Sequence, residues 1–242
     1  MFFLPLRDHP NPEGFRPWVT WALIAVNVAV FVLATSTATL NAWGFRPGQP
    51  EAADVFTSMF LHAGVLHLAG NMLFLWIYGD NVEHRLGHGR FLLAYLATGA
   101  AAVAGHAALT PDSLVPMVGA SGAISGVLGF YFLWFKHHRV EVLGAVFPFW
   151  FGRIHVPARV LLGAYVVLDN LLPLLTTTGG SVAYGAHLGG FFAGIVGAAV
   201  VFRGRRPPAG RPPGWRPAPL PGGLERQSGW SKRLPGRKRP RY

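Results

Sequence analysis

The stretch Gly119-Ala120-Ser121-Gly122 opens an apolar run, from Ala120 to Phe135, that contains no charged residue. The glycines beside the serine let another backbone come close and leave the hydroxyl uncrowded. The first amides of a helix lack intrahelical partners, so they could bind negative charge that develops beside Ser121. Small residues with a serine also form tight contacts between membrane helices. The stretch alone therefore fits either a packing contact or a reactive hydroxyl.

The composition is typical of a membrane protein. Hydrophobic residues make up 51% of the 242 residues, charged residues make up only 13%, and the mean hydropathy is positive. The 31 glycines suit closely packed membrane helices. The absence of cysteine excludes disulfides, a thiol nucleophile and a thiolate metal site.

Six apolar runs have lengths that could cross or nearly cross a bilayer. They cover about residues 18–38, 57–79, 90–109, 120–135, 157–175 and 182–202. The first run follows a charged segment and lacks a small-residue cleavage pattern, so we predict a retained helix and not a signal peptide. We therefore predict an all-α membrane protein: a bundle of six transmembrane helices over residues 18–202, after a cytoplasmic segment, 1–17, and before a tail, 203–242.

The charges predict the orientation in the membrane. Six spans place both termini on one side, and every Lys and Arg except Arg46 falls on that side. The positive-inside rule then puts both termini in the cytoplasm, which suits a multi-pass protein of a bacterial plasma membrane. The tail, 203–242, is rich in Pro, Gly and Arg, so we predict that it is disordered and can contact anionic lipids. No recognition motif accompanies its charge, and we expect no nucleic-acid partner.

Polar residues fall in the outer half of three separate runs. They are His62, His67 and Asn71 in the second run, Ser121 in the fourth and His187 in the sixth. The fourth run has sixteen residues, which rise about 24 Å, less than a hydrocarbon core of about 30 Å. We therefore expect this run to begin below the outer surface, where water can reach Ser121 through a cavity.

His187 is the best candidate for a base that activates Ser121, because a serine becomes a nucleophile when a neighbouring group takes its proton. Glycine stripes on both runs would let the two helices approach closely. The stripes are Gly190 and Gly194 near His187, and Gly122, Gly126 and Gly129 after Ser121. His187 could instead form an ordinary interhelical hydrogen bond, but ionisable residues at this depth are costly and usually functional.

His67 and Asn71 are four residues apart, so they share a helix face, and both can donate hydrogen bonds as an oxyanion hole requires. His62 and His67 are five apart, which separates their directions by roughly 140° and disfavours a zinc pair. We therefore predict no metal site. His62 fits a structural hydrogen bond as well as an accessory role. Asp169 could assist His187, cap a loop or bind water, so we predict a Ser–His dyad without it.

From about Phe56 to Phe202 the chain resembles the rhomboid family of intramembrane serine proteases. The resemblance rests on three motifs in order: His62…His67…Asn71, Gly119-Ala120-Ser121-Gly122, and Ala186-His187…Gly190…Gly194. The segment Val82-Glu83-His84-Arg85-Leu86-Gly87 also resembles a turn of the family in which the acid and the Arg serve structure.

The resemblance implies a six-helix core in which Ser121 is the nucleophile and His187 the general base and later the acid. It implies that His67, Asn71 and the Ser121 amide hold the oxyanion, with Gly119 and Gly122 in structural or accessory roles. The substrate would be a transmembrane segment, cleaved near the outer face, and no cofactor is implied. In family members the fifth span and its following loop are proposed to move aside for substrate, here roughly Pro157 to Ser181.

One departure from the family concerns the support of the base. Some members carry an aromatic residue four positions after the nucleophile, on which the histidine stacks, but here that position is Ser125. We therefore expect another group to hold His187, and Tyr184, one turn before it, is a candidate.

Two other functions fit part of the pattern. A non-catalytic rhomboid-like protein would bind transmembrane helices, although such relatives usually lack the serine or the histidine. A small transporter would need polar residues that continue to the cytoplasmic side, where the fourth and sixth runs carry only apolar and small residues.

Overall fold

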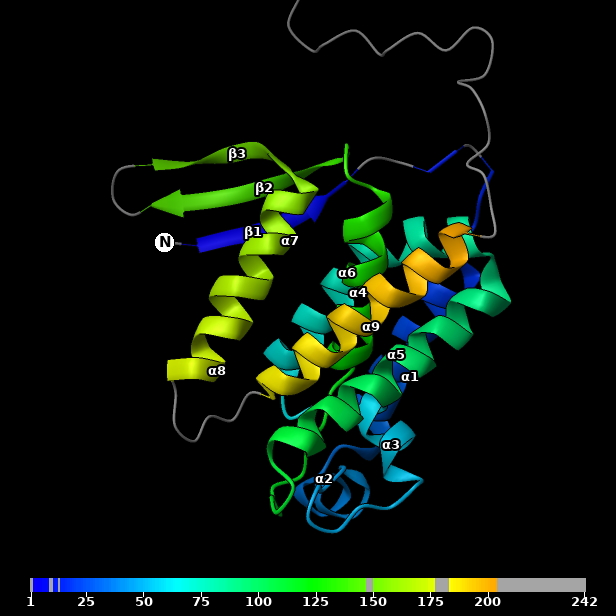
Figure 1. Cartoon of the computed structure of the whole chain (residues 1–242), viewed down its shortest axis with the longest axis vertical. Helices are drawn as coiled ribbons and strands as arrows, with labels where there is room; N and C mark the ends of the chain where they lie inside the picture. The colour runs from blue at the N-terminus through cyan, green and yellow to red at the C-terminus, as the bar shows by residue number, and fades with distance from the viewer. Residues whose placement is uncertain (1, 9–10, 13, 147–149, 177–182, 204–242) are drawn as a thin grey trace, which may run out of the picture. The chain divides into compact units, whose positions relative to one another are not determined.

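The computed structural model describes residues 2–8, 11–12, 14–146, 150–176 and 183–203. Its helices, in chain order, are α1 (Trp18–Ala34), α2 (Thr37–Trp43), α3 (Asp54–Thr57), η1 (Ser58–Phe60), α4 (Val65–Leu86), α5 (His88–Leu109), α6 (Ser121–Trp134), α7 (Ala158–Val166), η2 (Val167–Leu171), α8 (Leu172–Thr176) and α9 (Tyr184–Arg203). Its strands are β1 (Phe2–Arg7), β2 (Arg139–Val146) and β3 (Trp150–Pro157), as Figure 1 shows. The predicted disordered tail lies outside the described residues, apart from Arg203.

Each of the six apolar runs contains a helix, so the prediction of a mostly helical membrane protein is confirmed. Within the described residues, three helical segments are long and apolar enough to cross a membrane: His88–Leu109, Ala158–Thr176 and Tyr184–Val201. A fourth span results if Asp54–Phe60 and Val65–Leu86, which meet at a bend of 95°, count as one. Because α1 and α6 have only 17 and 14 residues, six crossings stay a prediction.

Helix α6 is the centre of the bundle. Ten of its 14 residues are buried, and α4, α5 and α9 pack around it (Figure 1). Its sequence is apolar or small on every side, which suits a helix without a solvent face. The residue at its first position, Ser121, is thereby held by three neighbouring helices.

Glycines bring the backbones of α6 and α9 into direct contact. A Cβ atom on Gly190 would lie 2.0 Å from the carbonyl oxygen of Gly122, and one on Gly194 would lie 2.0 Å from that of Gly126. A Cβ atom on Gly129 would lie 2.1 Å from the carbonyl oxygen of Phe191. No side chain fits at such distances, so the predicted pairing of the two glycine stripes is confirmed.

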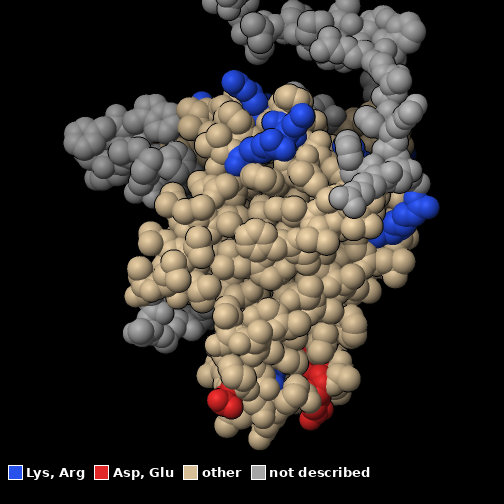
Figure 2. Space-filling view, in the orientation of Figure 1, with Lys and Arg blue, Asp and Glu red and all other residues tan. Residues whose placement is uncertain are grey.

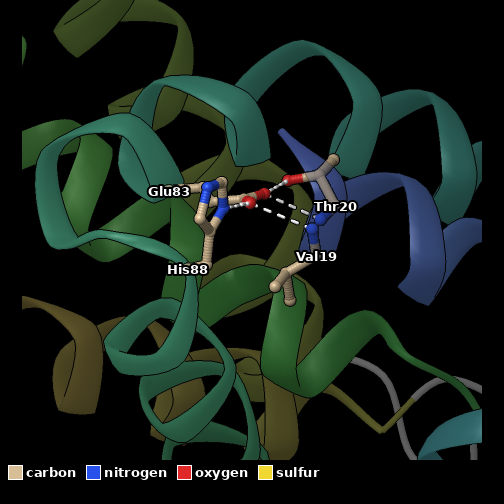
Figure 3. Close-up of polar contacts among 4 residues, drawn as sticks. All are labelled: Val19, Thr20, Glu83 and His88. Carbon is tan, nitrogen blue, oxygen red and sulfur yellow. Dashed lines mark hydrogen bonds and ion pairs between the residues drawn. The ribbon is translucent and has the colours of Figure 1, made fainter. Parts of the chain in front are cut away.

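Glu83 anchors α1 to the turn between α4 and α5, as Figure 3 shows. Its fully buried carboxylate accepts hydrogen bonds from the amides of Val19 and Thr20, at 2.9 and 2.7 Å, and from the Thr20 hydroxyl at 2.6 Å. His88 Nδ1 lies 2.5 Å from the same group. The first amides of α1 have no intrahelical partners, so a buried carboxylate satisfies them and its charge suits the helix N-terminus.

Arg85, two residues after Glu83, contacts the end of α6. Its guanidinium group lies over the Trp134 ring, 4.7 Å from the ring centroid. A cation over an indole face is an attractive contact, and here it joins the end of α4 to the end of α6. Glu83 and Arg85 therefore both make structural contacts, as the resemblance of this turn implies.

The all-α prediction missed a three-stranded antiparallel sheet in the order β1–β2–β3. Phe2 of β1 pairs with Ala145, and Arg139 of β2 pairs with Pro157. Val140 and Val142 are fully buried, while Glu141 between them binds Arg7 of β1 at 2.5 Å and Arg153 of β3 at 3.3 Å. This two-residue period is that of a strand. Because β3 ends at Pro157 and α7 begins at Ala158, the sheet leads directly into the helices of the fifth apolar run.

Asp8, directly after β1, joins the N-terminal segment to the bundle. Its Oδ2 atom accepts hydrogen bonds from the Tyr131 hydroxyl at 2.5 Å and from Asn81 Nδ2 at 2.8 Å. Burial raises the pKa of Asp8 from 3.8 to about 7, and the charge of Asp80 acts in the same direction, although both hydrogen bonds oppose the shift. The charged form of Asp8 is therefore disfavoured in the folded protein.

We expect Gly194→Ala to lower the melting temperature of the protein in detergent. The added methyl group would meet the carbonyl oxygen of Gly126, and overpacking of this kind typically costs about 1–3 kcal/mol. Gly163→Ala is a matched control, because a Cβ atom on Gly163 meets nothing within 4 Å and alanine favours the helix by up to about 1 kcal/mol. A Gly194→Ala protein that melts at or above the wild-type temperature would contradict direct backbone contact.

We expect Asp8→Asn to flatten the dependence of stability on pH. The folded-state pKa, about 7, exceeds the ordinary value of 3.8, so the folded protein holds the proton more tightly than the unfolded chain. Stability from this group is therefore complete below about pH 4 and is lost as the pH rises towards 7. Asp8→Asn should melt above wild type at pH 8 and near it at pH 4. The same change at exposed Asp112 is the control, and equal pH profiles for wild type and Asp8→Asn would refute the shift.

Candidate active site

The segment before α6 is fixed by backbone hydrogen bonds that place Ser121. Phe45 and Met117 exchange two of them, at 3.1 and 2.8 Å, and the Gly119 amide donates to the Ser58 carbonyl at 2.8 Å. Gly119 has a φ of +127°, a conformation that favours glycine. A Cβ atom on Gly119 would also lie 2.8 Å from His67 Nε2. Glycine is thus required here for both backbone conformation and space.

Ser121 and His187 meet across the α6–α9 contact. Ser121 Oγ lies 2.9 Å from His187 Nε2. The two residues are 66 positions apart in sequence, and the glycines below them bring the helices close enough for a direct hydrogen bond. A serine hydroxyl and an imidazole at this distance can act as a nucleophile and its general base.

His67 and Asn71, from α4, line the same cavity as Ser121. The position that a Gly119 Cβ atom would take is 2.8 Å from His67 Nε2 and 3.5 Å from Ser121 Oγ, so both groups border one small space. The Asn71 side chain is 7% exposed, and its buried Nδ2 donor has no hydrogen-bond partner among the described residues. Two such donors near a serine hydroxyl can form an oxyanion hole.

His62 is fully buried in the segment before α4. Its ring lies edge-to-face against the His67 ring, with centroids 5.2 Å apart. His67 thus lines the cavity with Ser121, and His62 packs against the His67 ring.

A cavity of about 1050 Å³ opens around these groups. Ser121, His187, His67 and Asn71 line it, and residues of the fifth apolar run, including Tyr165 and Leu174, complete its wall. The volume is at the upper end for small-molecule pockets, so the cavity has room for a peptide segment. Within the described part of the chain, no group of three or more His, Asp or Glu side chains is placed to hold a metal ion.

The side chain that holds His187 was missed by the sequence reasoning. His187 Nδ1 lies 2.6 Å from Asn170 Oδ1 of η2, and Asn170 Nδ2 donates to the Tyr165 carbonyl at 2.8 Å. Tyr184, the expected partner, lines the cavity instead. Asp169, the neighbouring carboxylate, is exposed. Asn170 could have been noticed as a polar residue within the fifth apolar run. The sequence reasoning considered only its neighbour, Asp169, as a partner for His187.

Ser125 also has a role that its sequence position alone does not reveal. Its Oγ atom lies 2.9 Å from the Tyr165 hydroxyl of α7. At this position, where some family members carry an aromatic residue on the nucleophile's own helix, the aromatic ring comes from α7 instead. The Tyr165 and His187 ring centroids are 6.4 Å apart, at an interplanar angle of 32°. The support of the histidine therefore comes from the fifth apolar run.

Residues 49–204 match the Rhomboid domain family. The chain is 41% identical to rhomboid protease GluP of Bacillus subtilis over 48% of this chain and 24% of that protein. It is 30% identical to rhomboid protein 1, mitochondrial, of Saccharomyces cerevisiae over 80% of this chain and 54% of that protein. It is 27% identical to rhomboid protease GlpG of Klebsiella pneumoniae over 82% of this chain and 66% of that protein.

The chain thus spans between about a quarter and two thirds of the length of these relatives. The matched residues include the glycine-lined contact, the Ser121–His187 pair and the α4 donors described above. The family match agrees with the apolar helices, of which three or four can cross a membrane. The chain is a multi-pass integral membrane protein and belongs to the rhomboid family.

Proposed function

We propose that this protein is an intramembrane serine endopeptidase that cleaves transmembrane segments of membrane proteins near the outer face. The observation that carries the proposal is the 2.9 Å hydrogen bond between Ser121 Oγ and His187 Nε2, at the wall of a large cavity. The relatives named rhomboid protease support the same reaction class.

The proposed reaction begins when Ser121 Oγ attacks the scissile carbonyl carbon while His187 Nε2 takes the hydroxyl proton. The carbonyl oxygen becomes an oxyanion and accepts hydrogen bonds from His67, Asn71 and the Ser121 amide. The intermediate collapses, the C–N bond breaks, and His187 gives its proton to the leaving amine. Water then attacks the acyl-enzyme with His187 again as the base, and this step releases the new carboxyl group and restores Ser121.

The proposed orientation, with both termini in the cytoplasm of a bacterial cell, follows from charge. On the face shown in Figure 2 most visible Lys and Arg side chains gather at the end that holds the strands, whereas Asp and Glu lie at the opposite end, beside α2 and α3. The positive-inside rule assigns the basic end to the cytoplasm. Ser121, at the start of α6, then lies towards the outer face. Contact of the basic tail, 203–242, with anionic lipids is part of the same proposal.

We expect Ser121→Ala and His187→Ala each to reduce cleavage of a co-expressed single-span substrate by about 10⁴-fold or to the detection limit, because each removes one half of the nucleophile–base pair. Cleavage is read by immunoblot, and labelling of purified protein by a fluorophosphonate probe reports the nucleophile. Ser36→Ala and exposed His137→Ala, which lie away from the cavity, are the controls. Cleavage by Ser121→Ala would refute the proposal. A folded wild-type protein that neither cleaves nor reacts with the probe would favour a non-catalytic protein that binds transmembrane helices.

We expect His67→Ala and Asn71→Ala to reduce kcat by about 10²–10³-fold each, with a smaller effect on KM, because an oxyanion donor acts mainly in the transition state. Initial rates on the single-span substrate in detergent measure both constants. His62→Ala should have a smaller effect on kcat than either change, since the His62 ring contacts His67. Wild-type kcat in both donor variants would exclude them from the oxyanion site.

A further inference from the structure

We propose that Asn170 is a positioning residue that completes a Ser121–His187–Asn170 chain and holds the imidazole in the tautomer that can accept the serine proton. The inference rests on the proposed function, because it assigns a role in that reaction. It concerns a residue of the fifth apolar run, outside the three motifs on which the family resemblance rests.

The orientation of the Asn170 amide is fixed by a backbone carbonyl. The oxygen and nitrogen of an amide side chain are assigned from their partners, because they are nearly indistinguishable by shape. One end of Asn170 lies 2.8 Å from the Tyr165 carbonyl oxygen, which can only accept a hydrogen bond. That end must therefore be the NH₂ group, and Oδ1 is the atom that faces His187.

The direction of the Asn170 amide determines the position of the histidine proton. Oδ1 can only accept, so His187 Nδ1, 2.6 Å away, must be the donor. A neutral imidazole has a single N–H group, so Nε2 carries a lone pair. Nε2 lies 2.9 Å from Ser121 Oγ, and the serine hydroxyl donates to it. This is the tautomer that a general base requires.

The Asn170–His187 bond also helps after the proton has moved. When His187 becomes an imidazolium ion, the hydrogen bond from Nδ1 to Asn170 Oδ1 becomes charge-assisted and therefore stronger. Asn170 is only 1% exposed, so water competes little for this bond. The neutral amide thus orients the ring and favours its charged form, without placing a carboxylate beside the imidazole.

Asn170 lies in an irregular part of the helical backbone. Val167–Leu171 is a π-helical turn, a rare element that occurs frequently at functional sites. Asn170 is the buried residue of the turn, whereas Leu168, Asp169 and Leu171 are exposed. The turn therefore directs one amide inward and leaves its neighbours at the surface of the bundle.

Tyr165 supports Asn170 and is itself held by α6. Its carbonyl oxygen accepts from Asn170, and its hydroxyl lies 2.9 Å from Ser125 Oγ. The fifth apolar run is thus joined by polar contacts both to the helix of the nucleophile and to the helix of the base. Displacement of η2 from α9 would break the contact that sets the tautomer of His187.

The test compares Asn170→Ala and Asn170→Asp with wild type on a single-span substrate in detergent. We expect Asn170→Ala to lower kcat by about 10–100-fold, the effect typical of a partner that orients a functional histidine, with KM within about twofold. Asn170→Asp keeps an acceptor for Nδ1–H but loses the donor to the Tyr165 carbonyl, so it should recover part of kcat. Its acidic limb in the kcat profile should move to higher pH by about one unit, because a carboxylate stabilises the protonated ring more than an amide does.

Asp169→Asn is the matched control, because it also exchanges a carboxylate and an amide, but at the adjacent, exposed position. It should keep the wild-type kcat and pH profile. If wild type cleaves and Ser121→Ala does not, the proposed function stands. A kcat within about twofold of wild type in Asn170→Ala would then overturn the role of Asn170. An unmoved acidic limb in Asn170→Asp would likewise overturn it, because a purely structural residue would not shift that limb.

A readout without activity separates the inference from the proposed function. In ¹⁵N-histidine-labelled protein in detergent, with the signals of His187 assigned by their loss in His187→Ala, we expect the hydrogen on Nδ1 in wild type. In Asn170→Ala we expect a mixture of tautomers. A hydrogen on Nε2 of wild type would overturn the inference whether or not the protein cleaves substrate.

Discussion

The direct contact between the α6 and α9 backbones is the constraint on which the site depends. At Gly190 and Gly194 not even a methyl group fits between the helices. Ser121 and His187 lie at the α6 start and in the first turn of α9, so the same contact sets their separation. The close packing of the two backbones therefore sets the separation of the proposed nucleophile and base.

The helices of the fifth apolar run, α7 and α8, lie at the edge of the bundle and not at its centre. Figure 1 shows α7 and α8 beside the bundle, whereas α6 lies within it. The polar contacts of this run, from Tyr165 to Ser125 and from Asn170 to His187, attach it to the two helices that carry the dyad. The α6–α9 contact therefore sets the distance between the proposed reacting atoms, and in our proposal the more peripheral segment sets the orientation of one of them.

The sequence predicted the parts of the site that lie within short motifs. Ser121, His187, His67 and Asn71 are recognisable because glycines or a four-residue spacing accompany them, and these local features persist in the structure. Asn170 could not be assigned, because its direction depends on a π turn that shifts the helix face and leaves no periodic signal. Tyr165 could not be assigned, because its partner Ser125 is 40 positions away in sequence. The sheet was missed for a related reason: the valines that alternate around Glu141 form a short pattern, and the β1 partner of β2 is far away in sequence.

The pairing of β1 with β2 has a consequence for how the protein is made. The ribosome releases the N-terminal residues first, so Phe2 must wait for Ala145, its partner, until the helices up to α6 have been synthesised. Closing this sheet is a late and long-range event of the kind that slows folding. An affinity tag fused before Phe2 would be present while β1 pairs with β2, next to the strands that lead into α7. Recombinant versions of the protein are therefore better extended at the other terminus.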